Sequence, residues 1–243
     1  MGSIRKDEEI IIGIHQPNFL PWLGYFYKIT KSDIFVLLDN VQYTKNSFIN
    51  RNKIKTSQGD HWLTVPVSFK FGDLIKDVTI DNNIDWRKKH LKTFELNYKK
   101  APHFDEIYNF LERVYYKKEW IFLADFNIEL IVEICCFLDM NKKFIKASSL
   151  NILGKSTDLL INIVKNLNGD IYLSGKGGQQ YQDESKFNKE NIKLIYSDFK
   201  HPVYRQLWGE FIENLSIIDI LFNLGKESKI FLTKVDVTRV EDV

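Results

Sequence analysis

The sequence predicts an α/β fold, a mainly parallel sheet flanked by helices, with an added β-hairpin region and a helical segment in the middle. Two observations predict it. Continuous apolar runs rich in β-branched residues, at 10–14 and 34–38, enclose a helix-like stretch at 21–29 that has proline at its start. This strand, helix, strand rhythm is typical of a βαβ unit. Short apolar runs at 171–173 and 192–196 show that the alternation returns in the second half.

The segment between the two α/β parts follows other patterns. Strand-like stretches at 47–54 and 61–67 enclose a turn at 57–60, which predicts a hairpin. Apolar residues at helical spacing then predict three helices, at 86–98, 104–116 and 120–138.

The domain organisation that we expect is a single α/β domain over residues 1–243, because no linker or internal repeat divides the chain. Its parts are an N-terminal βαβ and hairpin part (10–82), a helical segment (83–140), a C-terminal α/β part (141–225) and a charged tail (226–243).

Composition limits the classes of function. The chain carries 34 basic and 32 acidic residues, a net charge of +2, so it has no basic excess for nucleic acid. No apolar run reaches the roughly 20 residues of a spanning helix, so we expect no membrane insertion. Cys135 and Cys136 are adjacent and build no disulfide framework, which favours a reducing cytoplasm. The oligomeric state stays open, a homodimer included.

Polar residues follow several predicted strands at the point where each strand ends. His15 and Gln16 come directly after the first strand, Asp39 after the second and His201 shortly after the last. In open α/β sheets, ligands bind at the carboxyl ends of strands, and histidine exchanges protons near neutral pH. We therefore expect His15, Asp39 and His201 to share one cleft as catalytic groups. The alternatives are a histidine held by a loop carbonyl and an ordinary Asp-Asn turn.

Other residues are candidates for substrate binding. A basic and amide cluster at 50–53 suits a diphosphate or a carboxylate, and a glycine-rich stretch at 174–178 can cradle an anion. A solvated hairpin strand and a flexible loop are the respective alternatives. No Cys and His spacing resembles a metal site, so no metal is predicted. The predicted binding residues, with aromatic side chains that can stack on a base or a sugar, are Gln16, Trp22, Tyr43, Asn50, Arg51, Asn52, Lys53, Trp62, Ser174, Gly175, Tyr181, Tyr204 and Gln206.

The stretch from His15 to Phe26, His-Gln-Pro-Asn-Phe-Leu-Pro-Trp-Leu-Gly-Tyr-Phe, resembles the opening signature of the WbqC-like protein family. Later blocks also match, and the similarity runs from about Ile10 to Gly225. The matching blocks are 38–43, 50–56, 62–67, 172–175, 201–204 and 214–219.

The resemblance implies a setting and a reaction class. Members of this family tend to be encoded among genes for bacterial surface polysaccharides and O-antigens. The expected function is N-acyl or aminoacyl transfer to an amino sugar that is nucleotide-linked, with a histidine general base. The cofactor stays open; the reaction implies an acyl or aminoacyl donor, either acyl-CoA or carrier-bound.

Two further readings stay open. The first loop is loosely reminiscent of nucleotidyltransferases, although Asn18 and Phe19 stand near the place of their second histidine. That reading includes ATP-dependent amide formation. The other reading is a non-catalytic protein that binds a nucleotide-linked sugar.

Overall fold

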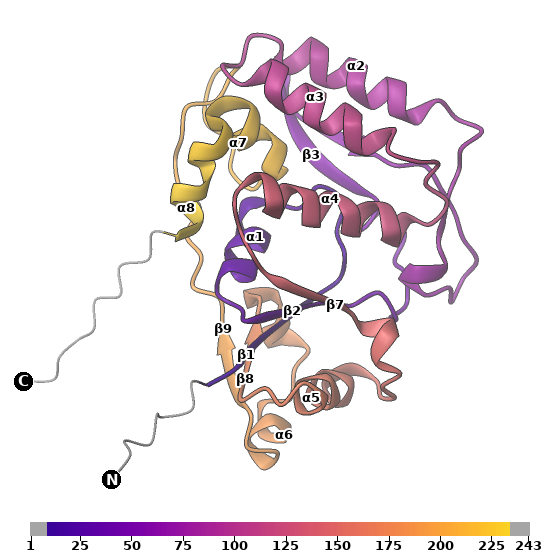
Figure 1. The fold of residues 1–243 in the computed structure, drawn as a ribbon, viewed down its shortest axis with the longest axis vertical. Helices are drawn as coiled ribbons and strands as arrows, with labels where there is room; N and C mark the ends of the chain where they lie inside the picture. The colour runs from indigo at the N-terminus through magenta and orange to yellow at the C-terminus, as the bar shows by residue number, and fades with distance from the viewer. Residues whose placement is uncertain (1–8, 234–243) are drawn as a thin grey trace, which may run out of the picture.

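The central feature of the fold is a sheet of five parallel strands (Figure 1). The structure is a computed structural model and describes residues 9–233. The strands lie in the order β7-β2-β1-β8-β9, and this arrangement confirms the predicted α/β class. Their bounds are β1 (Ile11–His15), β2 (Ile34–Leu37), β7 (Lys143–Lys146), β8 (Ile171–Ser174) and β9 (Lys193–Tyr196).

The strand order reverses beside β1. From β1 the chain builds outward through β2 to β7, and then returns to the other side of β1 to add β8 and β9. Within β1, Ile12 lies opposite Ile34 of β2 and opposite Tyr172 of β8. The connections after β1 and β8 therefore leave in opposite directions. This reversal opens a crevice at the carboxyl ends of the two strands.

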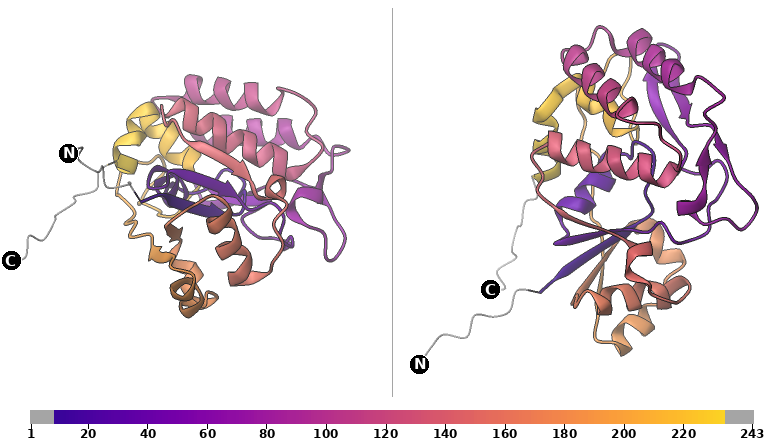
Figure 2. Two further views of the ribbon diagram at one scale, coloured as in Figure 1. Left: turned by 60° about the horizontal axis from the view of Figure 1, so that its bottom comes forward. Right: turned by 45° about the vertical axis from the view of Figure 1, so that its right-hand side comes forward.

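Helices cover both faces of the sheet (Figure 2). Helices α1 (Leu23–Thr30) and α4 (Leu123–Phe137) lie on one face, whereas α5 (Ser156–Asn166) and α6 (Glu184–Lys189) lie on the other. Alternate residues of β1 point to the same face of the sheet. Ile12 and Ile14 point to the face that α5 covers, where they pack in one cluster with the apolar residues of that helix. The sequence did not predict α6, which has only six residues.

The segment between β2 and β7 forms a separate layer above α1. It contains the predicted hairpin, a second short antiparallel pair and the predicted helices at 86–98 and 104–116. Two C-terminal helices return to this layer beside α1. None of the described helices is long and apolar enough to cross a membrane. The remaining elements of the described chain, in this layer and elsewhere, are β3 (Arg51–Thr56), β4 (Gly59–Thr64), β5 (Val67–Ser68), β6 (Thr79–Ile80), α2 (Trp86–Tyr98), α3 (Phe104–Tyr115), α7 (Ile217–Leu224), α8 (Ile230–Thr233), and the 3₁₀ turns η1 (Ile75–Asp77), η2 (Ala147–Leu150), η3 (Lys176–Gln180) and η4 (Gly225–Lys229).

A buried amide holds the loop that follows β1. The side chain of Asn127 on α4 is fully buried, and its Nδ2 donates to the carbonyls of Pro17 at 2.8 Å and Ile49 at 2.7 Å. Asn52 of β3 donates to the carbonyl of Leu20 at 2.7 Å in the same way. These bonds satisfy carbonyls that have no strand partner, and so position the loop that leads from β1 to α1.

We expect Asn127→Ala to destabilise the protein by about 2–4 kcal/mol, because the substitution leaves two buried carbonyls without a donor. Urea denaturation followed by circular dichroism measures the change. The control is Cys136→Ser on the same helix, since Cys136 is exposed. A loss below about 1 kcal/mol for Asn127→Ala would show that the two hydrogen bonds do not hold the loop.

Candidate functional site

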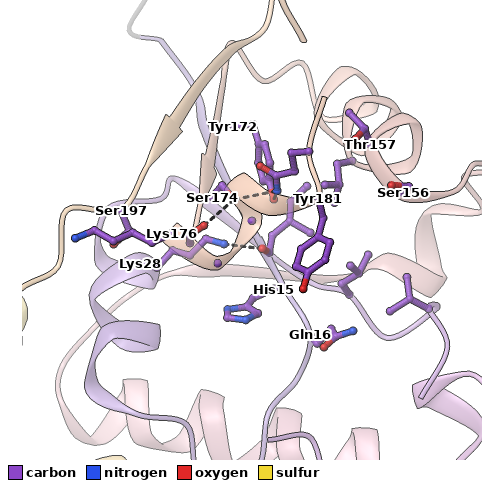
Figure 3. Close-up of a pocket in the computed structure, with 18 of the residues that line it drawn as sticks. His15, Gln16, Lys28, Ser156, Thr157, Tyr172, Ser174, Lys176, Tyr181 and Ser197 are labelled. Atoms are coloured by element: carbon purple, nitrogen blue, oxygen red, sulfur yellow. Dashed lines mark hydrogen bonds between the residues drawn. The ribbon is translucent and has the colours of Figure 1, made fainter. Parts of the chain in front are cut away.

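A cavity of about 820 Å³ lies at the carboxyl ends of β1 and β8, at the point where the strand order reverses (Figure 3). Helix α1 on one face of the sheet and α5 on the other both contribute to its walls. Its size and position are typical of a ligand site in an open α/β sheet. The lining includes His15, Gln16, Trp22, Lys28, Tyr172, Ser174, Gly175, Lys176, Gly178, Tyr181, Gln182 and Phe199.

The charged groups of the described cavity wall are cationic: Lys176, and Lys28 when it is protonated. Among the described residues, the lining includes Lys28 and Lys176 but no aspartate or glutamate. Trp22 and Phe199, whose ring centroids are 5.4 Å apart, form an aromatic part of the wall. An anionic ligand with a flat or apolar portion matches this lining best.

His15 reaches the cavity from the last position of β1. Its ring stacks on that of Tyr25 from α1, with centroids 4.7 Å apart. Its Nδ1 is buried and has no hydrogen-bond partner in the described part of the chain. Burial, together with the charge of Lys28, lowers the pKa of His15 to about 3. The imidazole is therefore neutral at physiological pH and takes up a proton only weakly.

Lys28 is one of the wall residues that the sequence did not predict, together with Gln182, Ser197 and Phe199. It lies in the last turn of α1, where a lysine ordinarily complements the helix dipole at the surface. Here its side chain is only 3% exposed, and Nζ donates to the Ile14 carbonyl at 2.6 Å (Figure 3). Burial lowers the pKa of Lys28 to about 7. A signal was available in the sequence, because Lys28 lies in a short helix of mostly apolar and aromatic residues. The structure buries all of them from Leu23 to Ile29.

The glycine-rich stretch after β8 forms the opposite wall. Gln182 Nε2 donates to Ser174 Oγ at 2.9 Å and to Tyr172 Oη at 3.1 Å, which ties the end of this loop to the strand. A Cβ at position 178 would lie 2.4 Å from Ser174 Oγ, so Gly178 permits that close approach. The stretch is thus a compact 3₁₀ turn against the cavity.

Six of the predicted site residues line this cavity, and Asp39 does not. The carboxylate of Asp39 is buried at the end of β2, where it accepts hydrogen bonds from Ser148 N at 2.8 Å and Ser148 Oγ at 2.6 Å. It therefore links β2 to the turn after β7. The six that line the cavity are His15, Gln16, Trp22, Ser174, Gly175 and Tyr181.

The predicted residues at 201–206 lie beside the cavity without lining it. The ring of His201 is 5.9 Å from that of Phe199, which is in the wall, and His201 Nδ1 lies 2.9 Å from the Pro202 carbonyl. Tyr204 instead donates to Asp219 at 2.8 Å, and Gln206 accepts from Lys55. The cavity therefore brings together His15 and the β8 loop, but not His15 and His201.

The predicted residues of the hairpin region do not line the cavity. The Arg51 guanidinium stacks over Trp62 at 4.2 Å, and Lys53 pairs with Asp60 at 2.5 Å. Both basic side chains of the cluster therefore have partners within the hairpin. The remaining predicted residues, which also do not line the cavity, are Tyr43, Asn50 and Asn52.

The buried amine predicts a specific dependence of stability on pH. The folded-state pKa of Lys28 is about 7, below its ordinary value of 10.5. Above pH 7 the unfolded chain binds more protons at this residue, so Lys28 makes the free energy of unfolding rise with pH. Relative to Lys28→Met, the wild type should gain about 2–3 kcal/mol between pH 6 and pH 9.

Urea denaturation of both proteins across this pH range measures the difference. Lys45→Met is the control, because Lys45 is exposed and its removal should leave the pH dependence as in the wild type. Parallel curves for the wild type and Lys28→Met would contradict a lowered pKa.

Comparison with known proteins agrees with the sequence resemblance. The profile of the WbqC-like protein family matches residues 16–230. The uncharacterized protein Rv1507c of Mycobacterium tuberculosis is 37% identical over 224 residues, which cover 91% of this chain and 96% of that protein. No solved structure matches. The matched region contains most of the cavity wall and nearly all of the described fold, and the chain belongs to the WbqC-like protein family.

Proposed function

We propose that the protein is a sugar-modifying transferase, whose cavity binds a nucleotide-linked amino sugar and transfers an acyl or aminoacyl group to the sugar nitrogen. The observation that supports it best is the cavity at the strand-order reversal, where the described lining contains Lys176 and the partly protonated Lys28 but no carboxylate. A nucleotide diphosphate supplies the negative charge that such a wall attracts.

The wall offers a place for each part of this ligand. Lys176 and the glycine-rich turn suit the diphosphate, and Trp22 and Phe199 suit a base or a sugar ring. Amide formation also needs donors for the tetrahedral oxyanion and an acceptor for the proton of the sugar ammonium. We assign the neutral imidazole of His15, which lies in the wall, as a hydrogen-bond partner of a reacting group.

The biological setting is part of the proposal. We infer a role in bacterial surface polysaccharide or O-antigen synthesis, because the WbqC-like resemblance points to genes of that kind. The acyl or aminoacyl donor is a thioester, either acyl-CoA or carrier-bound, and the cytoplasm is the compartment where nucleotide-linked sugars and such donors meet.

A second candidate is adenylyl transfer. The favouring observation is that β1 ends at His15 beside the cavity, and that α1 starts nearby, with Gly24 of its first turn in the wall. A triphosphate would also suit the positive lining. Release of pyrophosphate from ATP, in the presence of an amino sugar phosphate, would favour this candidate over acyl transfer.

Binding of UDP, dTDP and GDP, measured by calorimetry at low salt, tests the location of the anion site. We expect Lys176→Glu to weaken binding at least about tenfold, which is about 1.4 kcal/mol, because it reverses a charge in the wall. Arg51→Gln on the hairpin should leave the affinity unchanged. The reverse pattern would move the diphosphate to the hairpin.

Acyl transfer itself is tested with nucleotide-linked amino sugars and acyl-CoA, by mass spectrometry of the sugar and by thiol release. An increase in sugar mass equal to the acyl group, matched by one free thiol per product, is the expected result. Nucleotide-sugar binding without turnover for every donor would instead support a non-catalytic binding protein.

A further inference from the structure

The amine of Lys28 occupies an unusual position in the cavity. It comes from α1, lies almost completely out of solvent and ends beside the carboxyl end of β1 (Figure 3). Among the described residues, its hydrogen-bond acceptor is a single backbone carbonyl, that of Ile14. An ammonium has three hydrogens to donate, so one acceptor leaves the charged form poorly compensated.

Two other lysines with a lowered pKa show the contrast. Lys55 donates to the Gln206 side chain and to the Glu210 carbonyl, and the carboxylate of Asp219 acts on it electrostatically. Lys142 donates to the carbonyls of Thr30 and Ser32, each at 2.8 Å. Both lysines lie outside the cavity wall and have two acceptors that explain their burial. Lys28 has fewer protein partners and faces the cavity.

The groups that face Lys28 give it no counter-charge. His15 of β1 is neutral at physiological pH, and the ring of Tyr172 on β8 is centred 6.0 Å from the Lys28 nitrogen. Tyr25 of α1 stacks on His15, and Lys176 and Tyr181 reach the wall from the turn after β8. Among the described residues of the wall there is no carboxylate. A neutral amine is therefore populated near pH 7, in agreement with the lowered pKa.

We propose that Lys28 is the general base of this cavity and takes the proton from the amino group of the bound sugar. This inference rests on the proposed acyl transfer and assigns its proton acceptor. The physical reason is a match of basicity: a base works best when its pKa lies near the operating pH, and burial brings a lysine into that range while it takes His15 out of it.

The proposed step balances as follows. The sugar –NH₃⁺ gives one proton to the neutral Lys28 amine and becomes –NH₂. Its nitrogen attacks the thioester carbonyl carbon, so that a C–N bond forms and the C–S bond breaks. The second proton leaves the nitrogen for the departing thiolate, and the products are the amide, a thiol and protonated Lys28, which loses its proton to solvent.

The pH dependence of turnover tests this role. In the wild type, kcat should fall below about pH 7, as Lys28 becomes protonated. Lys28→Met, which keeps the length of the side chain, should lower kcat at least about 100-fold with little change in KM. Lys28→Arg should be equally impaired, because a guanidinium stays protonated. Lys142→Met is the matched control and should keep the wild-type rate and pH profile.

A second measurement does not depend on turnover. Competitive labelling with acetic anhydride, read for each lysine by mass spectrometry from pH 6 to pH 11, reports the basicity and access of each amine. Lys28 should titrate near pH 7 and be protected by UDP, whereas UDP should not protect exposed Lys45.

The outcomes separate the two proposals. Wild-type turnover with a Lys28→Met rate within about threefold of it would overturn the role of Lys28 and leave acyl transfer intact. Titration of Lys28 above pH 10, or labelling that UDP does not protect, would overturn its role as well. A protected amine that titrates near pH 7, in a protein that acylates no amino sugar, would overturn the proposed reaction and with it the step assigned to Lys28.

Discussion

The parallel pairing of β1 with β2 on one side and with β8 on the other is the constraint on which the site depends. Because the chain returns across β1 to begin β8, α1 and α5 are placed on opposite faces of the sheet. Neither helix closes the space above the ends of β1 and β8, and the cavity is the result. His15 and Ser174 face it for the same reason, since each ends one of these two strands.

The electrostatics of the cavity depend on the lack of a carboxylate beside Lys28 among the described residues. Removing an ammonium from water is costly unless it is paired, and the described wall has no carboxylate to pair with it. Lys55, although buried, meets Gln206, a carbonyl and the nearby Asp219, as expected for a structural lysine. Lys28, unlike Lys55, has only the Ile14 carbonyl as an acceptor among the described residues, so burial disfavours its charged form. The same energetic cost leaves a neutral amine available for chemistry at neutral pH.

Much of the fold was predictable, because local patterns decide it. The β-branched runs of β1 and β2 predict strands, and helical spacing places α2 at the residues 86–98 that the structure assigns. Ser216 caps α7 by accepting from the Ile218 amide, a role that serine favours at the start of a helix. The exception is α6, which is too short to show a periodic pattern and depends on its packing between α5 and β9.

The sequence by itself determined that polar residues gather at the carboxyl edge of a parallel sheet, because strand ends and glycine-rich turns are local features. Only the tertiary structure decided which of them share a cavity. His15 and Ser174 both line the cavity because β1 and β8 are neighbouring strands. Asp39, at the end of β2, instead accepts hydrogen bonds from Ser148. Burial of Lys28 depends equally on the packing of α1 against the sheet, since the same residue on an exposed helix would keep its charge in water.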